Sequence, residues 1–130
     1  MIKTKSVKST IEPAKDGLRI LATRIRGRGL KASRYHVWMA NLGPSEALLA
    51  DFRAEKISHA VFSRRYRKEL LEGGTIDRRN RVIKNHGQKF TLRLLQQLGK
   101  RQTITLMCHC EEGDARCHRH ILEEYLKGKI

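Results

Sequence analysis

The 130-residue sequence has few of the features that mark secreted, membrane-spanning or fibrous proteins. It contains only three cysteines, and an odd number argues against the disulfide framework of a small secreted domain. No apolar run approaches the roughly 20 residues of a membrane-spanning helix. The opening residues, MIKTKSVKST, lack the apolar core of a secretory signal. Two prolines and ten glycines exclude collagen-like and mucin-like compositions. We therefore expect a cytoplasmic protein without a membrane partner.

The remaining composition fits a single soluble domain spanning residues 1–130. Hydrophobic residues make up 39% of the chain and charged residues 32%. The length lies in the ordinary range of one domain, and it suffices to bury an apolar core without disulfides or metals. No internal repeat or linker divides the sequence.

Positive charge is the strongest compositional signal. Lysine and arginine number 28 against 13 acidic residues, which gives a formal net charge of +15. Such a surplus attracts polyanions, so nucleic acid is one candidate partner. The arginines that would contact phosphates are Arg26, Arg64, Arg65, Arg67, Arg78, Arg79 and Arg81. The alternative is that these charges form an ordinary solvated surface.

Hydrophobic periodicity predicts alternating strands and helices. Short strands are expected at residues 2–8, 18–23 and 103–108. Helices are expected after the capping residues Ser33, Ser45 and Ser58, over residues 88–98, and from about 117 to 127. A helix that is followed by a short turn and the apolar strand 103–108 is typical of an α/β sheet. The predicted fold is one α/β domain with a few-stranded, mainly parallel sheet flanked by helices.

The same periodicity predicts which side chains form the core. The helix after Ser33 would carry Trp38 inward, and the helix after Ser58 would bury Phe62 and Tyr66, with the Tyr66 hydroxyl at the rim. Leu94, Leu95 and Leu98 would face inward from the next helix, and Gly73-Gly74 would end the helix before it.

Candidate chemistry is concentrated between residues 108 and 120. Ligands of α/β sheets bind beyond the carboxyl ends of strands, where helix N-termini present unpaired N–H groups. A thiol at such a helix start, Cys117, beside His118 and Arg119 could have a lowered pKa, although the acidic residues of the preceding loop oppose this shift. The candidates for a catalytic role are Cys117, His118 and Cys110.

One interpretation of this segment is a phosphatase loop. The run from His109 to Arg116 fits the pattern HCxxGxxR of cysteine-dependent phosphatases. Cys110 would attack phosphorus, and Arg116 would clamp two phosphate oxygens. Three carboxylates inside the loop, on Glu111, Glu112 and Asp114, are electrostatically unfavourable for a site that binds a dianion.

A second interpretation is a zinc site. By residue type the possible ligands are Cys108, Cys110, Cys117, His118 and His120. On a strand, Cys108 and Cys110 would point to the same face and His109 to the other. The spacing is not that of a standard zinc finger or ribbon, so no metal is favoured, and Cys108 could equally be a small buried hydrophobic residue.

The third interpretation comes from resemblance to a known family. Four segments carry it: LRILATRIRGRGLK (18–31), VWMANLGPSEALLADF (37–52), FSRRYRKEL (62–70) and TITLMCHCEEGDARCHRHILEEYL (103–126). In order and spacing they resemble the YeaO-like family, domain of unknown function 488, over about residues 2–126. The positions that match the family pattern include Arg24, Arg28, Gly29, Cys108 and the triplet Cys117-His118-Arg119. Gly27 and Arg26 depart from it, since the family has proline and tryptophan there.

The resemblance implies a compact α/β domain and leaves open whether the protein is an enzyme. Arg24, Arg28 and Gly29 follow one predicted strand, whereas the helix that begins near Cys117 follows another. If these strands are parallel neighbours, both groups meet at one edge of the sheet. They would form an anion pocket, to which Arg116 could contribute, for a phosphorylated small molecule or a nucleotide. A basic nucleic-acid-binding module and a phosphatase-like activity remain the alternatives.

Overall fold

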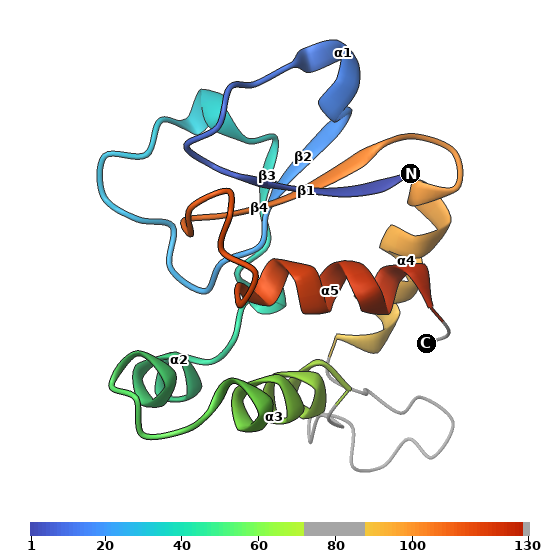
Figure 1. The fold of residues 1–130 in the computed structure, drawn as a ribbon. Helices are drawn as coiled ribbons and strands as arrows, with labels where there is room; N and C mark the ends of the chain where they lie inside the picture. The colour runs from blue at the N-terminus through green and yellow to red at the C-terminus, as the bar shows by residue number, and fades with distance from the viewer. Residues whose placement is uncertain (72–87, 129–130) are drawn as a thin grey trace, which may run out of the picture.

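The chain is built around a four-stranded sheet in which every strand pair is parallel. The computed structural model describes residues 1–71 and 88–128. The strands are β1 (Ile2–Ser6), β2 (Leu18–Leu21), β3 (Val37–Trp38) and β4 (Ile104–Cys108). They pair in the order β1-β4-β2-β3 (Figure 1). The strand that comes last in the sequence, β4, is therefore central, and the predicted parallel α/β fold is confirmed.

Helices are distributed unequally over the two faces of the sheet. The α-helices are α1 (Pro13–Asp16), α2 (Glu46–Arg53), α3 (His59–Leu71), α4 (Lys89–Gly99) and α5 (His118–Lys127), and the two 3-10 turns are η1 (Ala32–Arg34) and η2 (Ala40–Leu42). In Figure 1, α2 to α5 lie on one side of the strands. Two of the three predicted caps are present, because the hydroxyls of Ser45 and Ser58 accept hydrogen bonds from the N–H groups three residues on, both at 3.2 Å. Ser33 caps no helix, because it lies inside η1, which has no side-chain cap. Among the described residues, no helix is long and apolar enough to cross a membrane.

The main core fills the space between the sheet and helices α2 to α5. It joins Ile20 and Leu106 of the strands to Phe62 and Tyr66 of α3 and to Leu122 of α5. Phe62 and Tyr66 are buried, as predicted, but the Tyr66 hydroxyl is buried too and donates a hydrogen bond to the Leu42 carbonyl.

A smaller apolar cluster lies on the other face of the sheet. Val7, Leu21 and Met107 pack there beneath Leu30 and Tyr35, which belong to the segment between β2 and β3. One face of the sheet is thus covered by helices and the other by connecting loops.

Residues 33–39 do not form the predicted helix. η1 ends at Arg34, and the chain then extends to form the edge strand β3, where Trp38 pairs with Leu21. Trp38 is 42% exposed, and its indole N–H donates to the Thr23 carbonyl at 2.7 Å. The aromatic spacing resembled a helix face, but backbone pairing with β2 provides a better partner for these residues.

The prediction that Leu94 faces the core is also wrong, because this residue is 59% exposed. The buried face of α4 instead passes through Leu92, Leu95 and Gly99, at spacings of three and four residues. Neighbouring residues of an α-helix point in different directions, so Leu94 lies outside the face that Leu92 and Leu95 share. Arg78, Arg79 and Arg81 and the predicted helix end at Gly73-Gly74 lie outside the described residues.

A closed polar cluster lies at the amino ends of β2 and β4. The buried Asp16 carboxylate accepts hydrogen bonds from Lys5 Nζ at 2.7 Å and from the Glu12 N–H at 2.8 Å. The Asp16 carbonyl accepts from the Thr105 hydroxyl at 2.6 Å. Burial by itself would raise the pKa of Asp16, but the hydrogen bonds from Lys5 and Glu12 lower it below its ordinary value.

Candidate functional site at the carboxyl edge of the sheet

The carboxyl ends of β2 and β4 lie side by side. Leu21 is in register with Met107, and beyond the strands the Ala22 N–H still donates to the Met107 carbonyl at 2.9 Å. The contact continues between the His109 ring and the Ile25 carbonyl, at 3.2 Å. The two strands are therefore the parallel neighbours that the predicted pocket requires, and this edge is where parallel sheets bind ligands.

A cavity of about 210 Å³ opens at this edge. Its lining comes from the segments after β2, before and along α2, after β4, and at the start of α5. The lining residues are Thr23, Arg24, Ile25, Pro44, Leu49, Arg53, Cys108, His109, Cys110 and His118. Among the described residues, the lining includes two arginines, Arg24 and Arg53, and no acidic residue.

Arg24 is held in place by the turn that precedes α2. Its guanidinium donates to the Gly43 carbonyl at 2.7 Å and to the Pro44 carbonyl at 3.2 Å. Gly43 permits this contact, because a Cβ atom at that position would lie only 2.3 Å from the Arg24 backbone nitrogen. The second guanidinium, that of Arg53, is exposed at the end of α2.

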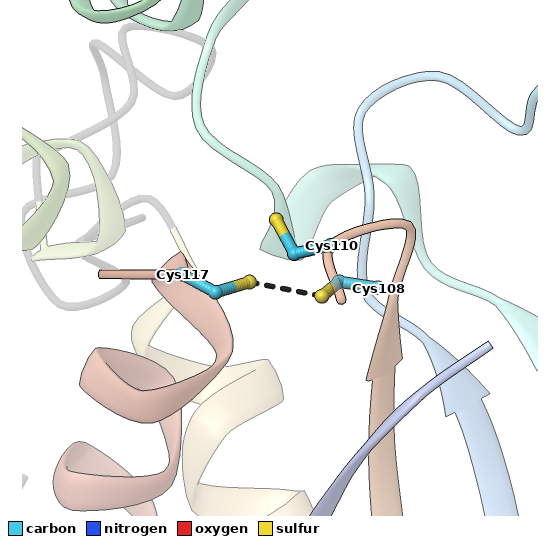
Figure 2. Close-up of side chains that lie close together, drawn as sticks. All are labelled: Cys108, Cys110 and Cys117. Carbon is cyan, nitrogen blue, oxygen red and sulfur yellow. Dashed lines mark hydrogen bonds between the residues drawn. The ribbon is translucent and has the colours of Figure 1, made fainter. Parts of the chain in front are cut away.

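Three thiols gather beside the cavity (Figure 2). The sulfur atoms of Cys108, Cys110 and Cys117 all lie within 4.8 Å of one another, and those of Cys108 and Cys117 are 2.9 Å apart. Cys108 is the last residue of β4 and Cys117 is the N-cap residue of α5. The cluster is compatible with a metal ion such as zinc, for which thiolates are preferred ligands. His120 does not join it, because its ring bonds to the Asp114 carbonyl at 3.0 Å.

The surroundings shift the pKa values of Cys108 and Cys117 in opposite directions. Hydrogen bonds from Cys110 and Cys117, together with the positive charge of Arg119, lower the pKa of the Cys108 thiol. The hydrogen bonds with Cys108 and Cys110, burial, and the nearby negative charge of Cys108 raise the pKa of Cys117. These effects outweigh the helix-start position of Cys117, and the guanidinium of Arg119 donates to Cys108 Sγ at 2.8 Å.

Arg119 is fully buried beneath the loop that joins β4 to α5. It donates to the carbonyls of Cys110 at 3.4 Å, Glu111 at 3.1 Å and Glu112 at 2.8 Å. Burial would lower the pKa of Arg119, but the negative charge of Cys108 raises it. Arg119 therefore holds the loop and the Cys108 sulfur in place from the protein interior, and it does not line the cavity.

These contacts give the loop a polarity opposite to that of a phosphatase loop. A phosphatase loop directs N–H groups at an anion, whereas here three successive carbonyls converge on a cation, Arg119. Arg116 is exposed and lies over the Phe52 ring, 5.4 Å from its centroid. The loop carboxylates turn away from the cavity, because Glu112 accepts from the Ser6 N–H and the Ser9 hydroxyl, and Glu111 pairs with Lys8.

His118 lines the cavity. Its Nε2 lies against the Ala22 carbonyl, which can only accept, so Nε2 carries a hydrogen. Burial lowers the pKa of His118, which favours the neutral ring. Nδ1 lies 3.8 Å from Cys117 Sγ.

The structure brings some of the predicted site residues together and separates others. Arg24, Cys110 and His118 line the cavity, and Cys117 lies directly behind it. Arg28 and Gly29 are exposed in the loop after β2 and are not among the lining residues. Arg53 also lines the cavity but was not predicted as a site residue, because nothing in its local sequence distinguishes it from other surface arginines. Arg53 reaches the cavity because α2 lies along one side of it, where Leu49 also lines it.

The fold and the site define a parallel α/β domain that has a thiol-containing, positively charged cavity at the carboxyl edge of its sheet. A family model, DUF488-N3a, described as the active DUF488-N3 subclade, matches residues 2–129. The chain belongs to this family, which confirms the resemblance to YeaO-like proteins seen in the sequence. No curated protein and no solved structure matches the chain.

Proposed function

We propose that the cavity at the carboxyl edge of the sheet binds the phosphate group of a phosphorylated small molecule or nucleotide. The observation that carries this proposal is the charge of the lining, since Arg24 and Arg53 face a cavity that no carboxylate lines within the described residues. Two arginines beside one concave site favour a phosphate, whose oxygens accept several charge-assisted hydrogen bonds from guanidinium groups.

The size of the cavity limits what can enter. Its volume of about 210 Å³ is below the roughly 300–1,000 Å³ of sites that enclose a whole drug-sized ligand. A phosphate group fits, and the remainder of the ligand extends past the exposed Ile25 toward solvent. Arg24 is already oriented by two backbone carbonyls, so its ordering costs little entropy on binding.

Calorimetric titration with inorganic phosphate and with a nucleoside monophosphate tests this proposal. Arg53→Gln should weaken binding roughly tenfold or more, because it removes a charge-assisted hydrogen bond. Arg28→Gln is the matched control, since it removes the same charge from an exposed arginine that does not line the cavity. Equal losses in both variants would show that only net charge matters and would contradict the proposal.

The salt dependence of binding distinguishes the anion cavity from the alternative, a basic nucleic-acid-binding module. Neutralisation of many phosphates by a basic surface makes affinity fall steeply as salt concentration rises, whereas one phosphate in a cavity responds weakly. A steep salt dependence together with indifference to Arg53→Gln would favour the nucleic-acid module. The phosphatase-like activity is not proposed, because the loop carbonyls converge on Arg119 and Arg116 lies outside the cavity.

A second candidate function is zinc binding by Cys108, Cys110 and Cys117. The mutual distances of their sulfur atoms, all within 4.8 Å, favour it, and soft thiolates select zinc over hard cations. Elemental analysis of the purified protein should find one zinc ion per chain, and Cys110→Ser should lower this content. His120→Gln is the control, because His120 lies outside the cluster. Protein free of metal, with three titratable thiols, would contradict zinc binding.

A further inference from the structure

We propose that a zinc ion held by the three cysteines has its fourth coordination position open to the cavity, so that the bound anion ligates the metal directly. This inference rests on the proposed anion binding and on the proposed zinc site. It differs from a structural zinc staple, in which four protein ligands close the coordination sphere.

The number of ligands is the first reason. Structural zinc sites have four protein ligands, whereas sites that keep an exchangeable position have three. In the described part of the chain, the group of mutually close ligand atoms consists of three thiols. No histidine or carboxylate joins them as a fourth ligand. His118 Nδ1 comes close to Cys117 alone, at 3.8 Å.

The second reason is the direction in which the cluster is open. Cys108 and Cys110 line the cavity, whereas Cys117 does not, and its sulfur points at that of Cys108 from the start of α5 (Figure 2). The buried side of Cys108 is occupied by the Arg119 guanidinium, 2.8 Å from the sulfur. An external ligand therefore reaches the thiols from the cavity.

Charge balance is the third reason. Three thiolates and a divalent ion leave one negative charge, which the buried Arg119 neutralises through its contact with Cys108. The charges of Arg24 and Arg53 then remain for the incoming anion. The same arrangement gives Arg119 a positioning role, since it supports the Cys108 sulfur and the loop carbonyls without entering the cavity.

Cobalt substitution of the full chain tests the inference. Tetrahedral cobalt(II) with thiolate ligands absorbs visible light, and its spectrum responds to a change of ligand. Titration with inorganic phosphate should shift this spectrum with the same dissociation constant that calorimetry gives. In Arg53→Gln the metal spectrum should persist, while its shift requires roughly tenfold more phosphate.

Different results would overturn direct ligation of the metal, the anion pocket and the metal site. Phosphate binding that leaves the cobalt spectrum unchanged would overturn direct ligation and leave the anion pocket standing. No phosphate binding in any form would remove the proposed function as well. Intact mass lower by two hydrogens, with no metal retained, would show a disulfide between cysteines and overturn the metal site. A different cobalt spectrum in phosphate-free His118→Gln would show that the imidazole fills the fourth position and would also overturn the inference.

Discussion

The two ends of the sheet carry charged clusters of opposite character. At the amino ends of β2 and β4, each oxygen of the Asp16 carboxylate accepts a hydrogen bond, and its charge is balanced by Lys5. At the carboxyl ends, Arg24 and Arg53 face a cavity that no described carboxylate lines. A buried cluster whose groups are satisfied maintains the fold, whereas an unbalanced charge in a concavity is available to a ligand. Mutations should therefore act on stability at one end and on binding at the other.

Asp16→Ala should produce the largest effect on stability. It leaves the nearly buried Lys5 ammonium without its carboxylate, and the loss of one partner of a buried pair costs about 3–5 kcal/mol. Urea unfolding followed by circular dichroism measures the change. Lys15→Gln is the control, because the exposed Lys15–Glu12 pair is worth at most about 1 kcal/mol. Equal effects in the two variants would show that the Asp16 cluster is not a major source of stability.

Arg119→Met should come next, with a loss of about 3 kcal/mol, because hydrogen bonds from a charged donor to three loop carbonyls disappear. Arg119 lies at the carboxyl end but is fully buried like Asp16 at the amino end, so burial and not position in the sheet should set the loss of stability. Arg119→Lys keeps the charge and should recover part of the loss. Unchanged urea unfolding in Arg119→Met would show that the loop holds its shape without the guanidinium.

Acid should weaken the amino-end cluster. The pKa of Asp16 is lower in the folded chain, so the stability that it contributes is fully present above its ordinary pKa of about 4 and is lost as pH falls through the folded value. For this single group the slope is at most about 1.4 kcal/mol per pH unit. Unfolding free energies measured between pH 5 and pH 2 should fall less steeply in Asp16→Asn than in the wild type. Identical slopes would show that other carboxyl groups dominate acid unfolding.

Arg53→Gln should have the smallest effect on stability, within about 0.5 kcal/mol, because its side chain is exposed at the end of α2. Its effect should be on phosphate affinity alone. A large drop in the thermal midpoint would indicate that Arg53 supports the fold and would blur the contrast between the two ends.

Local sequence patterns predicted the elements that have strong periodicity. The apolar strand that ends at Cys108, the caps Ser45 and Ser58, and the helix that begins at Cys117 are all close to their predicted places. The predictions are wrong where the position of a residue depends on packing against another element of the fold. Trp38 extends because β2 offers an edge to pair with, and Leu94 is exposed because the buried face of α4 passes through Leu92 and Leu95.

The candidate site was predictable only in part. Arg24, Cys110 and His118 follow predicted strands or start a predicted helix, and the carboxyl-edge rule places them together. The roles within the cysteine cluster were not predictable. Hydrogen bonds among the three cysteines lower the pKa of Cys108 and raise that of Cys117, and Arg119, although it is close to Cys117 in the sequence, donates to the sulfur of Cys108.

Residue types and their spacing were enough to predict the family, the parallel α/β class, the caps Ser45 and Ser58, and the concentration of cysteine and histidine after the last strand. These properties depend on local spacing and residue type, which a linear pattern records. Three features became known only from the folded chain: β4 lies between β1 and β2, Arg53 of α2 lines the cavity, and Arg119 is buried. Each of these features depends on contacts between residues far apart in the chain, or on which side of an element is buried. Local hydrophobic periodicity does not specify such contacts.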